Sequence, residues 1–328
     1  MNRRVALFDN IKFILIFLMV FGHLIESFAD DINLYKGLFV FIYAFHMPLF
    51  IFLSGLFYKK SSVKKNMVLY LILWFLVYCL NHLVYRYLRP SPPAFSPLLK
   101  LDGLPWFMFA TAAFYGLTGL LDQFDRKKVL LISLIPPLIS GFFPVIRDAF
   151  ALSRIIVYYP FFLAGSLIRA NGVMKLRQNK TFRIIGITAL ALWFIFCMVK
   201  PEYAAQLRHL FTGRNPFNPK YFPFGPVLRI ACYGLTCALS AGIISLTPEK
   251  EIPYITVFGQ RTVQVYFWST AFHAILILPR SIYTSLAHSV FGVPGILIIA
   301  LIEVCILSTK AASFPTSLIM KTVSEKVS

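Results

Sequence analysis

The first apolar segment of the chain contains four ionisable residues that lie on one face of the predicted helix. Lys12 and His23 are eleven residues apart, which in an α-helix is three turns plus about 20°, with a rise of about 16 Å. Asp9 and Glu26 extend this polar line at its two ends. A histidine titrates near neutral pH and can take a proton from a hydroxyl group, which is the role of a general base in acyl transfer. These four residues therefore form the predicted catalytic group.

The same residues also allow a structural interpretation. Asp9 and Lys12 can lie at the inner membrane interface and Glu26 at the outer one, with His23 as a hydrogen-bonded packing residue. Ionisable groups inside a membrane cost several kcal/mol unless they face a cavity or a partner. The alignment of all four on one face favours the functional interpretation.

A second apolar segment carries polar residues at membrane depth. His46 is followed by Pro48, which would free carbonyl groups one turn earlier and bend the helix there. Ser54 and Gly55 are small residues that permit close helix contact, so packing is their favoured role. We expect His46 to support His23 or to bind the acceptor, with Ser54 as a weaker candidate.

A third apolar segment contains Tyr266 and His273, which are seven residues apart and therefore share a helix face. They lie deep in the segment, where interfacial aromatic belts do not form. We predict that both residues support His23 or contact the acceptor. Near the inner mouth, basic side chains would attract a large anionic donor from the cytoplasm; they are Arg3, Arg4, Lys12, Lys59, Lys60 and Arg261.

Composition indicates an integral membrane protein. Of the 328 residues, 58% are hydrophobic and only 14% are charged, and the mean hydropathy is +0.73. A soluble domain carries about 25% charged residues. The chain has 32 Lys and Arg against 13 Asp and Glu, and basic loops between apolar runs explain this excess better than a nucleic-acid partner does.

Several classes of enzyme lack support in the sequence. The five cysteines lie inside apolar stretches without CxxC or clustered Cys/His spacing, so neither a disulfide framework nor a metal site is predicted. No GxSxG, HExxH or Walker motif accompanies the histidines. A hydrolytic triad, a zinc peptidase and an ATPase are therefore not indicated.

The apolar runs predict one all-α membrane domain, residues 1–328, with about ten transmembrane helices. Both termini are expected in the cytoplasm, because the segments that would then lie inside hold most of the basic residues. The long connections 86–103 and 200–224 would be external rims over a cavity. The sequence makes no prediction of oligomeric state. The expected helices lie near 10–28, 35–57, 67–88, 104–121, 129–146, 151–168, 182–200, 225–247, 262–279 and 293–313.

Five motifs carry a resemblance to a known family. They are Phe8-Asp9-Asn10-Ile11-Lys12 followed after ten residues by His23, Phe45-His46-Met47-Pro48 continuing to Ser54-Gly55, Pro105-Trp106-Phe107, Tyr159-Pro160 continuing to Gly165, and Gly259-Gln260-Arg261-Thr262 with Tyr266 and His273. Together they closely resemble the membrane acyltransferase-3 family, in particular its fucose 4-O-acetylase-like branch.

This resemblance implies ten helices and transfer of an acetyl group from cytoplasmic acetyl-CoA, with no bound cofactor. The acceptor would be a hydroxyl of a cell-surface polysaccharide or a lipid-linked sugar, and the enzyme would lie in the plasma or inner membrane. The resemblance also implies that His23 is essential and that Lys12 assists it.

The chain departs from the family pattern at two positions. Many relatives have Arg at the position of Lys12, and an ammonium cannot reproduce the bidentate grip of a guanidinium on phosphate. Some relatives carry an Arg-x-x-Arg pair in the next loop, where this chain has Lys59-Lys60 and Lys64-Lys65.

A proton-coupled transporter or flippase of a glycan or anion is the alternative function. A path lined by acidic, basic and histidine side chains through ten helices could serve it, although transporters usually contain paired broken helices in two repeated halves, and no such repeat is found. An inactive scaffold with the same fold is a further alternative.

Overall fold

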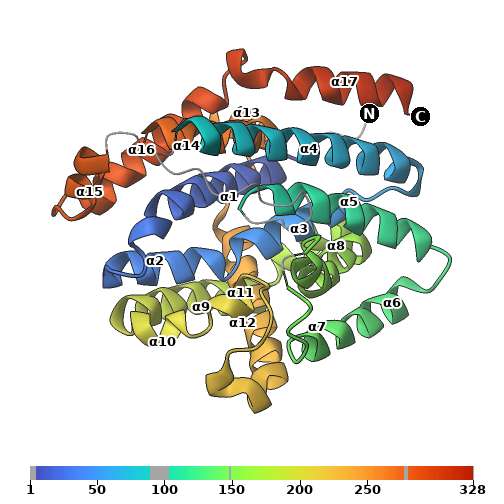
Figure 1. Ribbon diagram of the computed structural model, residues 1–328. Helices are drawn as coiled ribbons and strands as arrows, with labels where there is room; N and C mark the ends of the chain where they lie inside the picture. The colour runs from blue at the N-terminus through green and yellow to red at the C-terminus, as the bar shows by residue number, and fades with distance from the viewer. Residues whose placement is uncertain (1–4, 89–102, 148, 277–279, 328) are drawn as a thin grey trace.

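The secondary structure of the described part of the chain is helical. The computed structural model describes residues 5–88, 103–147, 149–276 and 280–327, and within these ranges it contains helices and no strand (Figure 1). The predicted all-α class is therefore confirmed for these residues. The helices are α1 Ala6–Ile25, α2 Asn33–Tyr43, α3 His46–Leu56, α4 Val63–Leu88, α5 Pro105–Leu120, α6 Arg126–Ser133, α7 Ile135–Ser140, α8 Leu152–Gln178, α9 Lys180–Val199, α10 Pro201–Ala205, α11 Arg208–Phe211, α12 Gly225–Leu246, α13 Ile255–Gly259, α14 Thr262–Leu276, α15 Arg280–Ala287, α16 Gly292–Leu307 and α17 Thr316–Lys326.

Most predicted helices match observed ones, with three differences. The predicted span 35–57 is divided into α2 and α3, and the predicted span 129–146 is divided into the short helices α6 and α7 at Pro136 and Pro137. The end of the predicted span 262–279 lies outside the described residues. Helices α10, α11, α13, α15 and α17 were not predicted, because they are short or amphipathic rather than long and apolar.

Five helical stretches of the described chain are long and apolar enough to cross a membrane, and α16 is a shorter apolar helix. With the apolar composition, they make this a membrane protein. The total of about ten crossings and the cytoplasmic location of both termini stay predictions. The five stretches are Ala6–Phe28, Asn33–Leu56, Lys60–Val84, Lys180–Val199 and Pro219–Leu246.

The break between α2 and α3 follows from Pro48. A proline cannot donate a hydrogen bond to the residue four positions earlier, and its ring clashes with that carbonyl. The freed carbonyl of Ala44 instead accepts a hydrogen bond of 2.6 Å from the hydroxyl of Thr236 on α12. The predicted bend is therefore observed as a complete break, and His46 becomes the first residue of α3.

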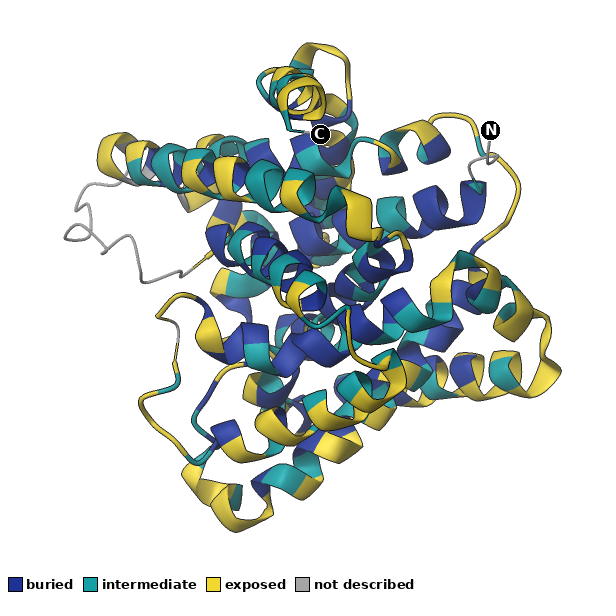
Figure 2. Cartoon of the chain, turned by 90° about the vertical axis from the view of Figure 1, so that its right-hand side faces the viewer, coloured by how far each residue is buried: buried dark blue, intermediate teal, exposed yellow. Residues whose placement is uncertain are grey.

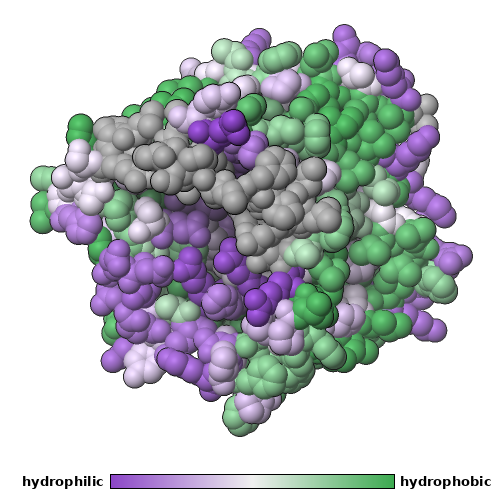
Figure 3. Space-filling view, in the orientation of Figure 1, coloured by the Kyte–Doolittle hydropathy of each residue, from purple (hydrophilic) through white to green (hydrophobic). Residues whose placement is uncertain are grey.

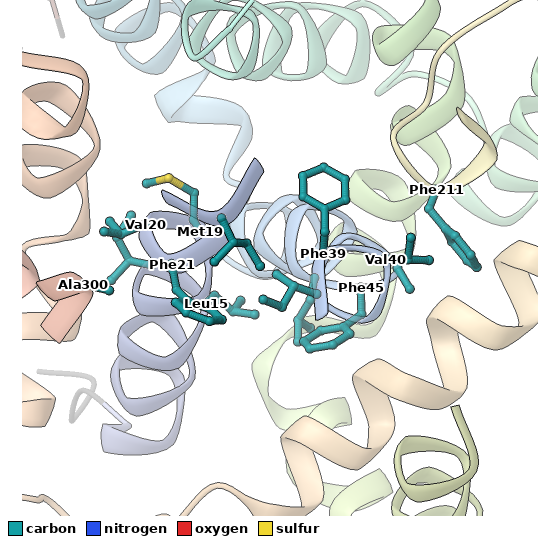
Figure 4. Packing of buried hydrophobic residues seen from close by; sticks show 14 of the residues in the cluster. Leu15, Met19, Val20, Phe21, Phe39, Val40, Phe45, Phe211 and Ala300 are labelled. Atoms are coloured by element: carbon teal, nitrogen blue, oxygen red, sulfur yellow. The ribbon is translucent and has the colours of Figure 1, made fainter. Parts of the chain in front are cut away.

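Helix α1 runs through the centre of the molecule. Most of its side chains are buried, and Figure 2 shows buried residues concentrated in the interior of the helical bundle. Met19, Val20 and Phe21 lie beside Ala300 of α16, while Phe39 comes from the neighbouring α2 (Figure 4). A helix enclosed in this way can present polar residues to protein rather than to lipid.

Large apolar side chains are exposed on several outer helices. Phe75 on α4, Ile185 and Ile195 on α9, and Val227 and Ile230 on α12 are between 49% and 64% exposed. Figure 3 shows hydrophobic surface gathered on the right of the molecule and hydrophilic surface at the lower left, over α2, α9 and α10. Extensive exposed apolar surface is typical of contact with lipid or partner proteins.

Two glycines allow α3 and α8 to touch backbone to backbone. A Cβ atom on Gly55 would lie 2.1 Å from the carbonyl oxygen of Phe162, and one on Gly165 would lie 2.2 Å from that of Phe52. No side chain fits at such distances, which confirms the packing role predicted for Gly55.

Replacing Gly55 by Ala is expected to lower stability by about 1–3 kcal/mol, because the added methyl group forces the two backbones apart. The matched control is Gly234→Ala on α12, where no neighbouring heavy atom lies within 4 Å of the place that the added methyl group would take. That control is expected to be neutral or to gain up to about 1 kcal/mol from helix propensity. Thermal unfolding in detergent measures both, and an equal effect of the two substitutions would contradict the close-contact argument.

Candidate active site

A cavity of about 330 Å³ lies beside α1. It is within the size range of small-molecule sites, which are about 300–1,000 Å³. Side chains from α1, α3, α4, α5, α14 and α17 line it, and Figure 1 labels these helices. The predicted site residues in its wall are Lys12, Ser54 and Tyr266.

The cavity is polar at one end and apolar at the other. Along α1 it extends from Lys12 to Met19, a rise of about 10 Å. Along α3 it extends from Phe57 back to Met47. Because His23 follows Met19 by one helical turn, the predicted base lies just beyond the apolar end of the cavity.

Lys12 lies at the polar end of the cavity. Its Nζ is 3.3 Å from Oδ1 of Asp9, which is 2% exposed, and 5.5 Å from the centre of the Phe57 ring. The carboxylate and the aromatic face therefore hold the ammonium group at the cavity wall.

Asn10 fixes this end of α1, although the sequence did not single it out. Its amide donates hydrogen bonds of 3.0 Å to the carbonyls of Pro248 and Lys250, and its Oδ1 accepts one of 2.7 Å from Thr256. Gly259 of α13 also touches α1, because a Cβ atom there would lie 1.8 Å from the carbonyl oxygen of Asp9. Asn10 and Gly259 thus set the position from which Lys12 enters the cavity.

The predicted donor-binding lysines of the next loop do not line the cavity. Lys60 is largely exposed and lies 3.4 Å from Oδ2 of Asp122, whose other oxygen is 2.5 Å from Arg126. The hydrogen bond from Arg126, together with that from Lys60, lowers the pKa of the Asp122 carboxyl. Lys59 is exposed and follows Phe57, a cavity residue, by two positions, so both lysines lie near the polar end.

Arg261 is engaged with the end of α16. Its guanidinium donates a hydrogen bond of 2.7 Å to the carbonyl of Ser308, a favourable position for a cation. Its neighbours Gln260 and Thr262 line the cavity, whereas Arg261 does not.

His23 and Glu26 form a pair at the other end of α1. Nδ1 of His23 lies 3.1 Å from Oε2 of Glu26, and the Tyr43 hydroxyl is 3.4 Å from the same nitrogen. Because a carboxylate only accepts hydrogen bonds, this contact assigns the proton of the neutral ring to Nδ1 and the lone pair to Nε2. The two side chains are 28% and 40% exposed, so the pair is accessible.

Arg208 completes this arrangement from a distant part of the chain. It contacts Oε1 of Glu26 at 3.4 Å and Oδ1 of Asp30 at 3.1 Å, and it lies 4.3 Å from the centre of the Phe39 ring. Arg208 was not predicted as a site residue; the only signal in the sequence was its position in the connection 200–224, expected to be an external rim.

His46 lies next to this pair. Its Nδ1 donates a hydrogen bond of 3.0 Å to the carbonyl of Ile42, which leaves Nε2 as an acceptor, and its ring packs edge-on against Tyr43 at 4.6 Å. His46 and His23 are close enough to interact electrostatically. The break at Pro48 therefore places a second imidazole beside the first.

Three predicted site residues remain, which are His273, Tyr266 and Ser54. His273 lies within electrostatic range of His23 and Glu26, which places it toward the His23 end. The Tyr266 hydroxyl donates to the carbonyl of Leu104, and the Ser54 hydroxyl donates to that of Phe50 at 3.0 Å. Both hydroxyl protons are thus used in bonds to the backbone.

The structure therefore separates the predicted residues into two groups. Asp9 and Lys12 lie at the polar end of the cavity, with Lys59, Lys60 and Arg261 around it. His23, Glu26, His46 and His273 lie at the opposite end. Among the described residues, no group of three or more His, Cys, Asp or Glu residues could hold a metal ion.

The fold and this divided site define a helical membrane protein with an elongated cavity alongside one helix. A family model described as an acyltransferase domain matches residues 5–307. The chain therefore belongs to the acyltransferase-3 family, and this membership supports an acyltransferase activity.

Comparison with curated proteins identifies two distant relatives. The chain is 25% identical to nodulation protein NolL of Sinorhizobium fredii over 215 residues, which cover 60% of this chain and 57% of that protein. It is 28% identical to nodulation protein NolL of Mesorhizobium japonicum over 186 residues, covering 51% and 48%. The chain thus spans about half the length of these relatives, and no solved structure matches it.

Asn10→Ala is expected to destabilise the protein by about 1–3 kcal/mol, because it removes two partly buried hydrogen bonds to backbone carbonyls and the buried hydrogen bond from the Thr256 hydroxyl. The control is Asn171→Ala on an exposed part of α8, where a change within about 0.5 kcal/mol is expected. Thermal unfolding in detergent gives both values. A stability loss no greater than that of the control would show that Asn10 does not anchor α1.

Proposed function

We propose that this protein is a membrane O-acyltransferase that moves an acetyl group from cytoplasmic acetyl-CoA to a hydroxyl of a cell-surface polysaccharide or lipid-linked sugar. It would act in the plasma or inner membrane, which it crosses about ten times with both termini in the cytoplasm. The motifs favour the fucose 4-O-acetylase-like branch of the family.

One observation carries the proposal. The cavity extends along α1 from Lys12 to Met19, and one turn further on His23 holds its Nδ1 against Glu26. A donor that enters at the Lys12 end can direct its thioester toward the lone pair on Nε2 of His23. In this proposal the residues of the motif serve the two ends of one donor route.

The proposed reaction needs one base and no net proton. Nε2 of His23 takes the proton of the acceptor hydroxyl while the oxygen attacks the thioester carbonyl. The C–O bond forms, the C–S bond breaks, and the protonated imidazole returns the proton to the leaving thiolate. The carboxylate of Glu26 holds the ring in the required tautomer and stabilises its charged form, as the orienting acid does in a catalytic triad.

Charges at both ends support these roles. Arg208 holds Glu26 on the side opposite His23 and so fixes the direction of the carboxylate. Lys12, with Lys59 and Lys60 near the polar end, would attract the phosphates of the donor. His46 and His273 lie near His23 and are candidates for contact with the acceptor.

His23→Ala is expected to reduce acetyl transfer by at least about 100-fold, the usual minimum contribution of a general base. The matched control is His288→Ala, directly after α15, because His288 is exposed and its ring bonds locally to the carbonyl of Thr284. The measurement follows radiolabel from acetyl-CoA into the carbohydrate of membrane vesicles, with the amount of protein in the membrane checked by immunoblot. Retained transfer by His23→Ala at a normal protein level would reject the proposed base, and movement of unmodified solute without label would favour a transporter.

Lys12→Gln is expected to raise the KM for acetyl-CoA by about tenfold or more, because a hydrogen bond to a charged group contributes about 1.5–3 kcal/mol. Lys220→Gln serves as the control, since Lys220 is an exposed cation in the connection 200–224. Initial rates over a range of acetyl-CoA concentrations give both KM values. An unchanged KM for Lys12→Gln would remove Lys12 from the donor site.

A further inference from the structure

Three methionines from three different helices close the cavity at its apolar end. Met19 of α1, Met47 of α3 and Met108 of α5 all line it, and their exposures are 1%, 7% and 1%. Met19 lies one turn before His23, and Met47 directly follows His46. These three residues, named here the methionine wall, line the cavity, and two of them adjoin in the chain the histidines that do not line it.

The opposite end of the cavity has a different chemistry. Lys12, Ser54, Gln260 and Thr262 line that end, and they supply one charge and three groups that can form hydrogen bonds. A ligand in this cavity therefore has polar surroundings along its arm and apolar surroundings at its tip. This polarity matches a thioester whose acyl group points toward the methionine wall.

The wall has to accommodate the acyl group during the reaction. His23 and His46 are not among the cavity-lining residues, so a thioester carbonyl can approach Nε2 of His23 only when methionine side chains shift. Methionine is unbranched and has three rotatable bonds, which allows such a shift without movement of the backbone. The surroundings are closely packed, so only a small group can be admitted at low cost.

We propose that the methionine wall selects the acyl group by size and makes the enzyme specific for acetyl donors. This inference rests on the proposed acyl transfer and identifies the class of donor for that same site. The two carbons of an acetyl group fit among the three side chains once these shift. Each further methylene needs a volume that Met19, Met47 and Met108 already occupy.

The test compares acetyl-CoA with butyryl-CoA in membrane vesicles from the native host, which contain the natural acceptor. Radiolabel incorporated into carbohydrate is measured for each donor, and the ratio of the two kcat/KM values is the readout. For the wild type, acetyl-CoA is expected to be preferred by about 100-fold, since each of two methylenes contributes roughly tenfold discrimination in a packed pocket.

Met108→Ala and Met47→Ala are expected to raise the butyryl-to-acetyl ratio by about tenfold or more, because each removes part of the wall. The matched control is Met67→Ala on α4. The side chain of Met67 packs against Gly116, and it is not part of the cavity lining. Its substitution creates a similar loss of volume elsewhere and should leave the ratio unchanged.

Equal use of the two donors by the wild type would overturn the inference while leaving the acyltransferase function intact. An unchanged ratio in both wall variants, at normal protein levels in the membrane, would also overturn it. If an alanine variant does not accumulate, Met108→Val gives the same readout with a smaller loss of volume. No transfer from either donor by the wild type would reject the proposed function itself.

Discussion

Helix α1 is enclosed by other helices, so each of its charged side chains needs a partner. The rest of the structure depends on this constraint. Helix α1 is buried over most of its length and still carries ionisable residues near both ends. In such surroundings an unpaired charge costs several kcal/mol. Asp9 lies beside Lys12 at one end, and Glu26 lies between His23 and Arg208 at the other. The apolar middle of the helix, around Leu15, needs no such partners, and it is the part that the cavity follows.

This arrangement separates two tasks that a transferase must perform on ligands of opposite character. An anionic donor needs cations and a long, mostly apolar passage, and an alcohol acceptor needs a base that can exchange protons. In the proposed function the Lys12 end of the cavity serves the first requirement, and the accessible pair of His23 and Glu26 serves the second. Because both ends belong to one rigid helix, their separation is fixed by the helical rise of about 1.5 Å per residue rather than by loop movement. In the proposed reaction the two ligands meet beside the methionine wall, near the turn of α1 that carries Met19 and His23.

The sequence predicted the features that depend on short-range periodicity. Apolar runs located most of the helices, the eleven-residue spacing put Lys12 and His23 on one face, and Pro48 predicted the bend after α2. Contacts between residues far apart in the chain could not be predicted in this way. Arg208 reaches Glu26 across 182 positions, and Asn10 binds Lys250 across 240. Nothing in the local pattern of either residue indicates its partner, because the packing of whole helices brings them together.

The break at Pro48 explains why local and long-range features meet in this site. In an unbroken helix over 35–57 the carbonyl of Ile42 would accept a hydrogen bond from the backbone N–H of His46, whereas Pro48 leaves the carbonyl of Ala44 without a backbone donor. The break instead leaves them to the His46 imidazole and the Thr236 hydroxyl, and it starts α3 at His46. One proline thus orients a second imidazole beside His23 and ties α12 to the same turn. A single local irregularity, readable from the sequence, therefore links the His23 end of α1 to a helix that lies almost 200 residues later in the chain.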